Sequence, residues 1–131
     1  MTMSVALALL LSAGPVTTVA VENQSAHPVE LTVERVPAHY LDAPRPSLAP
    51  GTSDRIGSVH GKIMLPHEEA GGELVTLRYL DPQGNGCVFT MTAVRHTSAW
   101  SKLKPSAMPI KRGKCEAGTG RTIGDFVYVI R

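Results

Sequence analysis

The chain has 131 residues, of which 43% are hydrophobic, and its formal net charge is +2. A chain of this length forms one domain of ordinary size, so we do not expect a second folded unit. The charge is small, and no nucleic-acid partner is expected.

The N-terminus has the composition of an export signal. Residues 1–21 contain no charged side chain, and Val5–Leu11 is an unbroken apolar run. A signal normally begins with basic residues and this one does not, so a buried strand or core helix over residues 5–13 is the alternative. The run stops at Pro15, well short of the ~20 residues that cross a bilayer, so no transmembrane span is expected.

Small residues allow signal cleavage at two positions, after Ala13 and after Ala20. We expect the cut after Ala13, because Thr17–Asn23 has the pattern of a strand that the later cut would interrupt. The signal then covers residues 1–13, with cleavage as late as residue 20 as the alternative. Residues 14–131 form the single domain of a periplasmic or secreted protein.

A two-residue period of apolar side chains dominates the rest of the chain and predicts β-strands. Thr17–Asn23 and Val29–Glu34 both alternate, and the short, turn-rich link between them predicts an antiparallel hairpin. Prolines make residues 37–51 unsuitable for a central strand. Asp54–Val59 then resumes a short strand.

The second half of the chain contains another paired pattern. Glu73–Leu80 alternates, a turn-rich segment follows, and Cys87–Val94 is the expected antiparallel partner. Residues 98–104 predict a short helix, and residues 105–120 predict an irregular, basic segment. Thr122–Ile130 is apolar on both faces, which indicates a strand inside a sheet.

Six or seven short strands separated by turns, without a convincing long helix, predict an all-β fold. We expect a single-domain antiparallel β-sandwich, for which Greek-key or immunoglobulin-like connections are one solution, and a small barrel is the alternative. The architecture by itself carries no function, so function has to be inferred from particular residues.

The two cysteines allow a single pairing. An exported protein resides in an oxidising compartment, where we expect the disulfide Cys87–Cys115. Closing this loop stabilises the fold by about 3.5 kcal/mol on the chain-entropy account. Neither cysteine has a second cysteine or a histidine at short ligand spacing, which argues against a zinc site.

Charge is distributed unevenly along the chain. Pro82–Cys115 contains no acidic residue, whereas the chain before it holds more acids than bases. Such asymmetry marks a surface for anionic partners, and an aromatic ring beside cations stacks on a sugar while the cations hold phosphate or carboxylate. The alternatives are a solvated loop that binds nothing and a tryptophan that fills the edge of the core. The candidate binding residues are Arg95, Trp100, Lys102, Lys104, Lys111, Arg112 and Lys114.

No set of catalytic or metal-binding residues has a specific pattern. His67-Glu68-Glu69 lacks the His-Glu-x-x-His spacing that places two imidazoles on one helix face. His60 and His67 with Met64 are candidate copper ligands, but no cysteine lies close to a histidine as a blue-copper site requires. Ser98, His96 and Asp125 supply the residue types of a catalytic triad, but no nucleophile elbow accompanies them. We therefore expect neither an enzyme nor a bound metal or cofactor.

Three functions stay open at this level. The first is a non-enzymatic exported module that engages an envelope component or another protein through exposed strand edges and the basic segment 95–114. The second is an inhibitor or immunity-like protein, in which a loop fixed by Cys87 and Cys115 plugs an enzyme cleft. The third is a small hydrolase or metal-binding protein. The first predicts a surface patch, the second a protruding loop and the third a pocket with converging polar groups.

Overall fold

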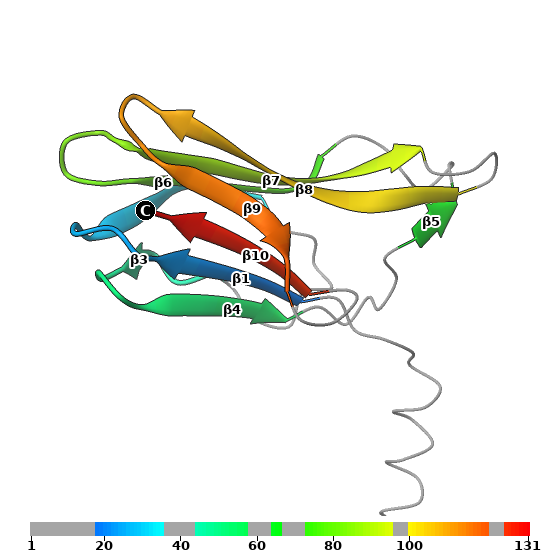
Figure 1. Cartoon of the computed structure of the whole chain (residues 1–131), viewed down its shortest axis with the longest axis horizontal. Coiled ribbons are helices and arrows are strands. Elements are labelled where there is room, and N and C mark those ends of the chain that lie inside the picture. The colour runs from blue at the N-terminus through cyan, green and yellow to red at the C-terminus, as the bar shows by residue number, and fades with distance from the viewer. Residues whose placement is uncertain (1–17, 36–43, 58–63, 67–72, 96–99, 121–124) are drawn as a thin grey trace, which may run out of the picture.

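The computed structural model describes residues 18–35, 44–57, 64–66, 73–95, 100–120 and 125–131. Over these ranges the chain forms strands and no helix (Figure 1), so no described helix is long and apolar enough to cross a membrane. The strands in chain order are β1 (Thr18–Asn23), β2 (Val29–Arg35), β3 (Ser47–Leu48), β4 (Ser53–Gly57), β5 (Met64–Pro66), β6 (Glu73–Leu80), β7 (Gly86–Arg95), β8 (Trp100–Ile110), β9 (Cys115–Thr119) and β10 (Asp125–Ile130).

The strands form two sheets that pack face to face (Figure 1). The smaller sheet has the order β4-β1-β10-β9, and the larger has the order β3-β2-β6-β7-β8-β5. Neighbouring strands run antiparallel except β1 and β10, which run parallel with Thr18 opposite Asp125. The predicted all-β sandwich is confirmed, and the sheets stay open instead of closing into a barrel.

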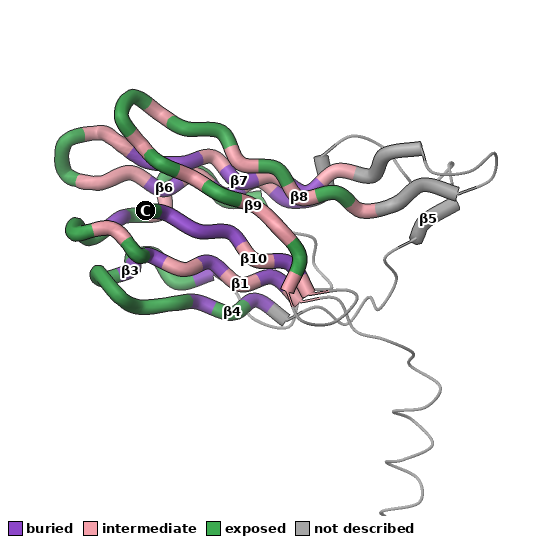
Figure 2. Tube along the Cα trace, in the orientation of Figure 1, coloured by how far each residue is buried: buried purple, intermediate pink, exposed green. Residues whose placement is uncertain are grey.

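The inner faces of the two sheets supply the core (Figure 2). Aromatic rings join them, because Phe89 of β7 stacks on Tyr128 of β10 with ring centroids 4.7 Å apart. The Tyr128 hydroxyl also donates a hydrogen bond to the carbonyl oxygen of Thr90 on the other sheet. The buried cluster comprises Val19, Val21, Val29, Leu48, Ile56, Val75, Leu77, Tyr79, Cys87, Phe89, Met91, Phe126, Tyr128 and Ile130.

The predicted hairpin between the first two strands is wrong. β1 lies in the smaller sheet and β2 in the larger sheet, so the link between them crosses the sandwich. β1 is paired on both sides by strands that are distant in sequence, β4 and β10. Val21 and Val29 are both buried in the common core, to which each of the two sheets contributes its inner face.

The predicted helix at residues 98–104 and the irregular segment at residues 105–120 are also wrong in the described ranges. Residues 100–110 form β8, which pairs with β7 from residue 101 to residue 110, and β9 follows after a tight turn. β8 contains Pro105 and Pro109, which a strand tolerates when its other side is a sheet edge. β5 pairs only with Trp100–Lys102, so both prolines lie beyond it on that edge.

Three strand predictions are confirmed. Glu73–Leu80 forms β6, and β7 is its antiparallel hairpin partner. β10 lies between β1 and β9, as its two apolar faces predict. Val129, on the face opposite Tyr128, is only 8% exposed. The described part of the proline-rich segment, residues 44–51, contributes the two-residue edge strand β3.

Candidate functional site

The predicted binding residues fall into two groups at opposite ends of β8. Lys102 and Lys111 are nine positions apart, which corresponds to about 30 Å of strand. One small ligand therefore does not contact both ends. The end where β8 begins, which we call the far end, holds Arg95, Trp100 and Lys102, whose side chains lie outside the described part of the structure. Lys104 is exposed two residues after Lys102. The end where β8 stops, which we call the near end, holds Lys111, Arg112 and Lys114.

Three chain segments meet at the near end of the sandwich (Figure 1). The β1–β2 link, the β6–β7 turn and the β8–β9 turn surround an open hollow of about 200 Å³. Sites for drug-sized ligands usually occupy about 300–1,000 Å³, so this hollow fits a single phosphate, carboxylate or similar group. The polar residues lining it include His27, Asp81, Asn85, Arg112 and Arg131.

Asp81 organises the β6–β7 turn. Its Oδ1 accepts hydrogen bonds from the backbone N–H groups of Gln83 (2.8 Å) and Asn85 (2.9 Å). Gly84 completes the turn with φ 82°, a conformation that glycine adopts without strain. This carboxylate therefore serves the turn, although it also borders the hollow.

The β8–β9 turn holds a cation in an unusual backbone conformation. The N–H of Gly113 donates to the carbonyl oxygen of Ile110 at 2.9 Å, which closes the turn. Lys111, at its tip, has φ 52°, in the left-handed region that side chains other than glycine rarely occupy. The Nζ of Lys111 lies over Gly84, where a Cβ added to that glycine would be only 2.9 Å away. The Lys111 side chain thus folds over the neighbouring turn.

Backbone contacts lock the two turns together. Arg112 donates its N–H to the side-chain Oδ1 of Asn85 at 3.1 Å. Gly113 passes so close to β7 that an added Cβ would lie 1.9 Å from the carbonyl oxygen of Gly86. No residue other than glycine fits there without a backbone shift, so the position of the β8–β9 turn is fixed by the β6–β7 turn.

The predicted disulfide is confirmed and lies directly behind this turn. Cys87 of β7 and Cys115 of β9 are bonded, with Cα atoms 5.9 Å apart, and the bond joins the larger sheet to the smaller one. The Sγ of Cys87 lies 3.7 Å from the carbonyl oxygen of Lys114. Covalent and packing constraints therefore both hold the segment that follows Arg112.

Asn23 fixes the third segment, the β1–β2 link. Its side chain is fully buried, and its Nδ2 donates to the carbonyl oxygens of His27 (2.9 Å) and Leu48 (3.0 Å). Its Oδ1 accepts from the N–H (3.0 Å) and the Oγ (2.6 Å) of Ser25. These bonds occupy the amide, so Asn23 is unsuitable as a glycan acceptor although Asn23-Gln24-Ser25 has the acceptor sequence.

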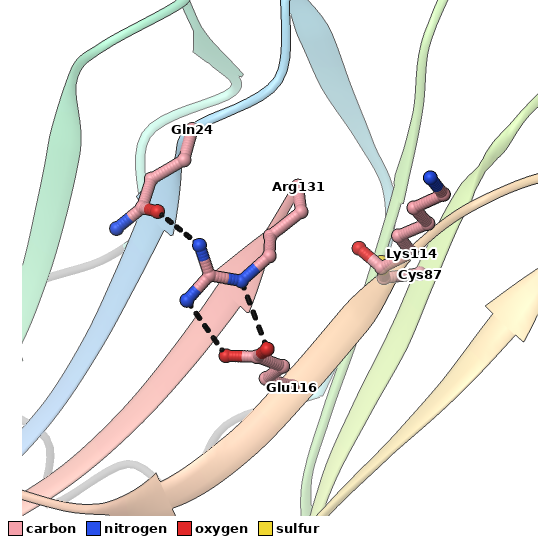
Figure 3. A network of polar contacts seen from close by, with 5 residues as sticks. All are labelled: Gln24, Cys87, Lys114, Glu116 and Arg131. Carbon is pink, nitrogen blue, oxygen red and sulfur yellow. Dashed lines mark hydrogen bonds and ion pairs between the residues drawn. The ribbon is translucent and has the colours of Figure 1, made fainter.

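Arg131, which follows β10, is already neutralised by an acid (Figure 3). Its Nε and Nη2 contact the two carboxylate oxygens of Glu116 at 2.9 and 3.0 Å, and its Nη1 donates to Gln24 at 2.9 Å. The hydrogen bond from Arg131 lowers the pKa of Glu116, and the same bond raises the pKa of Arg131. Both side chains are about half exposed, so this pair contributes little stability.

Three cations at this end have no acidic partner among the described residues. They are Lys111, Arg112 and Lys114, all exposed, and we call them the cationic turn. Figure 3 shows the Lys114 side chain pointing away from the Arg131–Glu116 pair. The sequence prediction included these three residues, but it missed His27 and Arg131. A polar residue in a turn cluster was the available signal for His27, and a cation after the last apolar strand was the signal for Arg131.

The residues considered for catalysis lie mostly elsewhere. His60, His67, His96 and Ser98 are outside the described residues. Asp125 accepts a hydrogen bond from the hydroxyl of Thr18. Within the described ranges, no three His, Cys, Asp or Glu side chains lie close enough together to hold a metal ion.

Comparison with known proteins gives no match. No family model matches the chain, and no curated protein or solved structure matches it at a significant level. β-Sandwiches carry many unrelated functions. Function therefore has to be inferred from the geometry of the cationic turn.

Proposed function

We propose that this chain is a non-enzymatic binding module, exported from the cytoplasm, that holds an anionic group of an envelope component at the cationic turn. The observation that supports this proposal is a cationic side chain without an acidic partner on a backbone that is held in place. Arg112 has no acidic partner among the described residues, while its backbone is held by Asn85 and by the disulfide behind it. A site that is ordered before binding loses less entropy when its ligand arrives.

The chemistry of these side chains favours phosphate or carboxylate. A guanidinium binds two oxygens of either group side by side, and an ammonium adds a point charge with rotatable donors. Arg112 also lines the hollow of about 200 Å³, which has room for one such group. Because the cations are exposed, their attraction is screened by salt over about 10 Å at 0.1 M ionic strength. Binding should therefore weaken steeply as salt is added.

Two features support an exported location. A structural disulfide is typical of the periplasm or the extracellular space. β1 begins at Thr18, and Thr18–Ala20 pair with both β4 and β10. Signal cleavage after Ala20 would remove half of this strand. We therefore place the cleavage after Ala13 and the mature protein in the periplasm or outside the cell.

Charge reversal tests the site. The full chain is titrated with phosphatidylglycerol vesicles, with phosphatidylcholine vesicles and with soluble polyphosphate, at low and at physiological salt. Arg112→Glu should weaken binding to the anionic probes about tenfold and reduce its salt dependence. Arg55→Glu is the matched control, because Arg55 is also an exposed arginine and lies on β4 of the smaller sheet.

The outcomes separate the explanations. Preference for the vesicles over polyphosphate points to a lipid headgroup, and the reverse points to a soluble or glycan-borne anion. Equal losses in Arg112→Glu and Arg55→Glu would mean that only net charge matters, and the proposed site would be wrong. The same conclusion follows if the unaltered chain binds neither anionic probe. Thermal unfolding of each variant checks that its fold is intact.

An inhibitor-like role is the second candidate. The segment bracketed by Cys87 and Cys115 contains the β7–β8 hairpin, which extends past the smaller sheet (Figure 1). A projecting hairpin tied at its base suits insertion into a cleft. Replacing residues 96–99 with a glycine-serine link of equal length tests this role. Loss of target binding in that variant, with full binding retained by Arg112→Glu, would favour the inhibitor over the anion-binding module.

A further inference from the structure

The outer face of the larger sheet has no described layer over it. Over the described ranges the sandwich consists of two sheets, and alternate residues of β2, β6, β7 and β8 point away from the core. The inward-pointing partners on β6 and β7, such as Leu77 and Phe89, are fully buried. Strand register therefore fixes which outward residues are neighbours.

One cross-strand row of this face is largely apolar. Val33 of β2 is opposite Arg78 of β6, Arg78 is opposite Val88 of β7, and Val88 is opposite Met108 of β8. Val33 and Met108 are 42% and 68% exposed, and they are the exposed large hydrophobic residues of the described chain. Single exposed apolar residues are common. Two of them aligned in one row, with a flexible methionine at its end, form a contact surface.

Arg78 lies in the middle of this row with an unused donor. Its Nε is buried and has no hydrogen-bond partner among the described residues. Buried polar groups are nearly always paired, so an unpaired one requires an explanation. A carboxylate is the acceptor that best matches a guanidinium, and because Arg78 as a whole is only partly buried, a docked carboxylate reaches this Nε once the side chain turns outward. Arginine is also among the residues that most often dominate binding energy at protein interfaces.

The charges around the row have predominantly one sign. Among outward positions with described side chains, Arg35, Arg78 and Lys104 are basic, and Glu30 is acidic. We propose that this face docks an acidic protein surface with an apolar centre, and that Arg78 receives one of its carboxylates. The surface is distinct from the cationic turn, so the inference does not depend on the proposed function.

The geometry disfavours two other occupants. A second copy of the chain, docked face to face, would bring surfaces of the same net charge together, which is repulsive. Strand addition along the edge of β8 is hindered by Pro105 and Pro109, which lack N–H donors. Four strands and six residues of length give a patch of about 400 Å², half of the about 800 Å² per partner in a standard complex. A transient complex is therefore expected.

Site-specific photo-crosslinking of the full chain tests this surface. A benzophenone amino acid replaces Val33 or Met108 in the native host, and a third variant carries it at Arg55 on the smaller sheet as the control. We expect both test positions to capture the same protein through an acidic peptide, and the control position to miss it. That protein is then purified, and its affinity for the chain is measured directly. Arg78→Gln should lower this affinity about tenfold, and Arg55→Gln should leave it unchanged.

Several results would overturn the inference. They are the absence of a shared protein adduct, an adduct with twice the mass of the chain, adducts with lipid alone, and an affinity that Arg78→Gln does not change. If Arg78→Gln lowers the melting temperature, the exposed pair Arg35→Gln and Lys104→Gln replaces it, with a several-fold loss expected. Arg112→Glu should not affect this complex. Failure here and failure of the anion site are thus distinguishable.

Discussion

Asn23→Asp removes the amide donor that holds the β1–β2 link at the near end of the sandwich, and it keeps the size of the side chain. The Nδ2 of Asn23 donates to the carbonyl oxygens of His27 and Leu48, at 2.9 and 3.0 Å. An aspartate keeps the acceptor for Ser25 but turns a negative oxygen towards those two carbonyls. The substitution therefore converts two hydrogen bonds into repulsive contacts inside a fully buried site.

The expected cost follows from the burial of each partner. Leu48 is buried, so removing the Asn23 donor from its carbonyl oxygen costs about 2 kcal/mol. His27 is exposed, and its carbonyl oxygen still accepts from the hydroxyl of Ser25 at 3.0 Å, so the loss there is about 1 kcal/mol. Burying the charge adds about 1 kcal/mol or more. We expect the free energy of unfolding to fall by about 3–5 kcal/mol at neutral pH, which lowers the melting temperature by about 12–20 °C.

The loss should depend on pH with a defined sign. A protonated carboxyl at position 23 donates one hydrogen bond, so folding raises its pKa above the unfolded value of about 3.9. The variant is thus least destabilised below about pH 4, and it loses stability as the pH rises from there through the raised pKa. The parent protein lacks this carboxyl and provides the reference curve.

Urea unfolding followed by circular dichroism at acidic and neutral pH measures the effect. Gln24→Glu is the matched control, because it makes the same chemical change on the next residue, which is exposed. The oxygen of Gln24 that accepts from Arg131 is kept in a glutamate, so this control should change stability by less than about 0.5 kcal/mol. Equal stability of the two variants at neutral pH, or a loss in Asn23→Asp that does not vary with pH, would refute the reasoning.

Three other substitutions test the disulfide and the β8–β9 turn at the near end of the sandwich. Replacing Cys87 and Cys115 together with alanine should lower the free energy of unfolding by about 3.5 kcal/mol, given the sequence separation of 28; a loss below about 1 kcal/mol in urea would contradict loop closure as the cause. Gly113→Ala should lower the free energy of unfolding by at least about 2 kcal/mol, because its Cβ would lie 1.9 Å from a backbone oxygen of β7. Gly118→Ala is the control: an added Cβ there has nothing within 4 Å, so stability in the same assay should hardly change. Lys111→Gly should stabilise the fold by about 0.5 kcal/mol and so raise the melting temperature, because glycine adopts the left-handed backbone without strain. The same variant should bind phosphatidylglycerol vesicles more weakly. A lower melting temperature would contradict the strain at Lys111, and unchanged vesicle binding would contradict its role in the site.

Local features explain the successful predictions. The β6–β7 hairpin could be predicted because its strands are adjacent in sequence and Asp81 and Gly84 supply the turn chemistry between them. β10 could be placed inside a sheet because both of its faces are apolar. The disulfide followed from cysteine number and the expected compartment.

Tertiary pairing explains the errors. Residues 100–104 carry a mixture of polar and apolar side chains that fits a short helix, but residues 101–110 of β8 pair with β7. Pro105 and Pro109 suggested an irregular segment, and an edge position makes them compatible with a strand. Neither the partner nor the edge can be read from the segment itself.

The candidate site shows the same division. Lys111, Arg112 and Lys114 are close in sequence, so their grouping was predictable. Their separation from Trp100 depends on β8 being an extended strand. Their approach to His27 depends on the β1–β2 and β8–β9 links, each of which joins one sheet to the other, meeting at one end. Local composition identified the charge, and the fold selected which charges act together.

The sequence by itself determined most of the strands, the β6–β7 turn and the cysteine pair, because alternation and turn chemistry act over a few residues. Only the tertiary structure decided which sheet each strand joined. β1 pairs in parallel with β10, with Val19 opposite Phe126, and that choice depends on burying apolar faces from distant parts of the chain against each other. Such long-range burial also positions the cationic turn and exposes the row centred on Arg78.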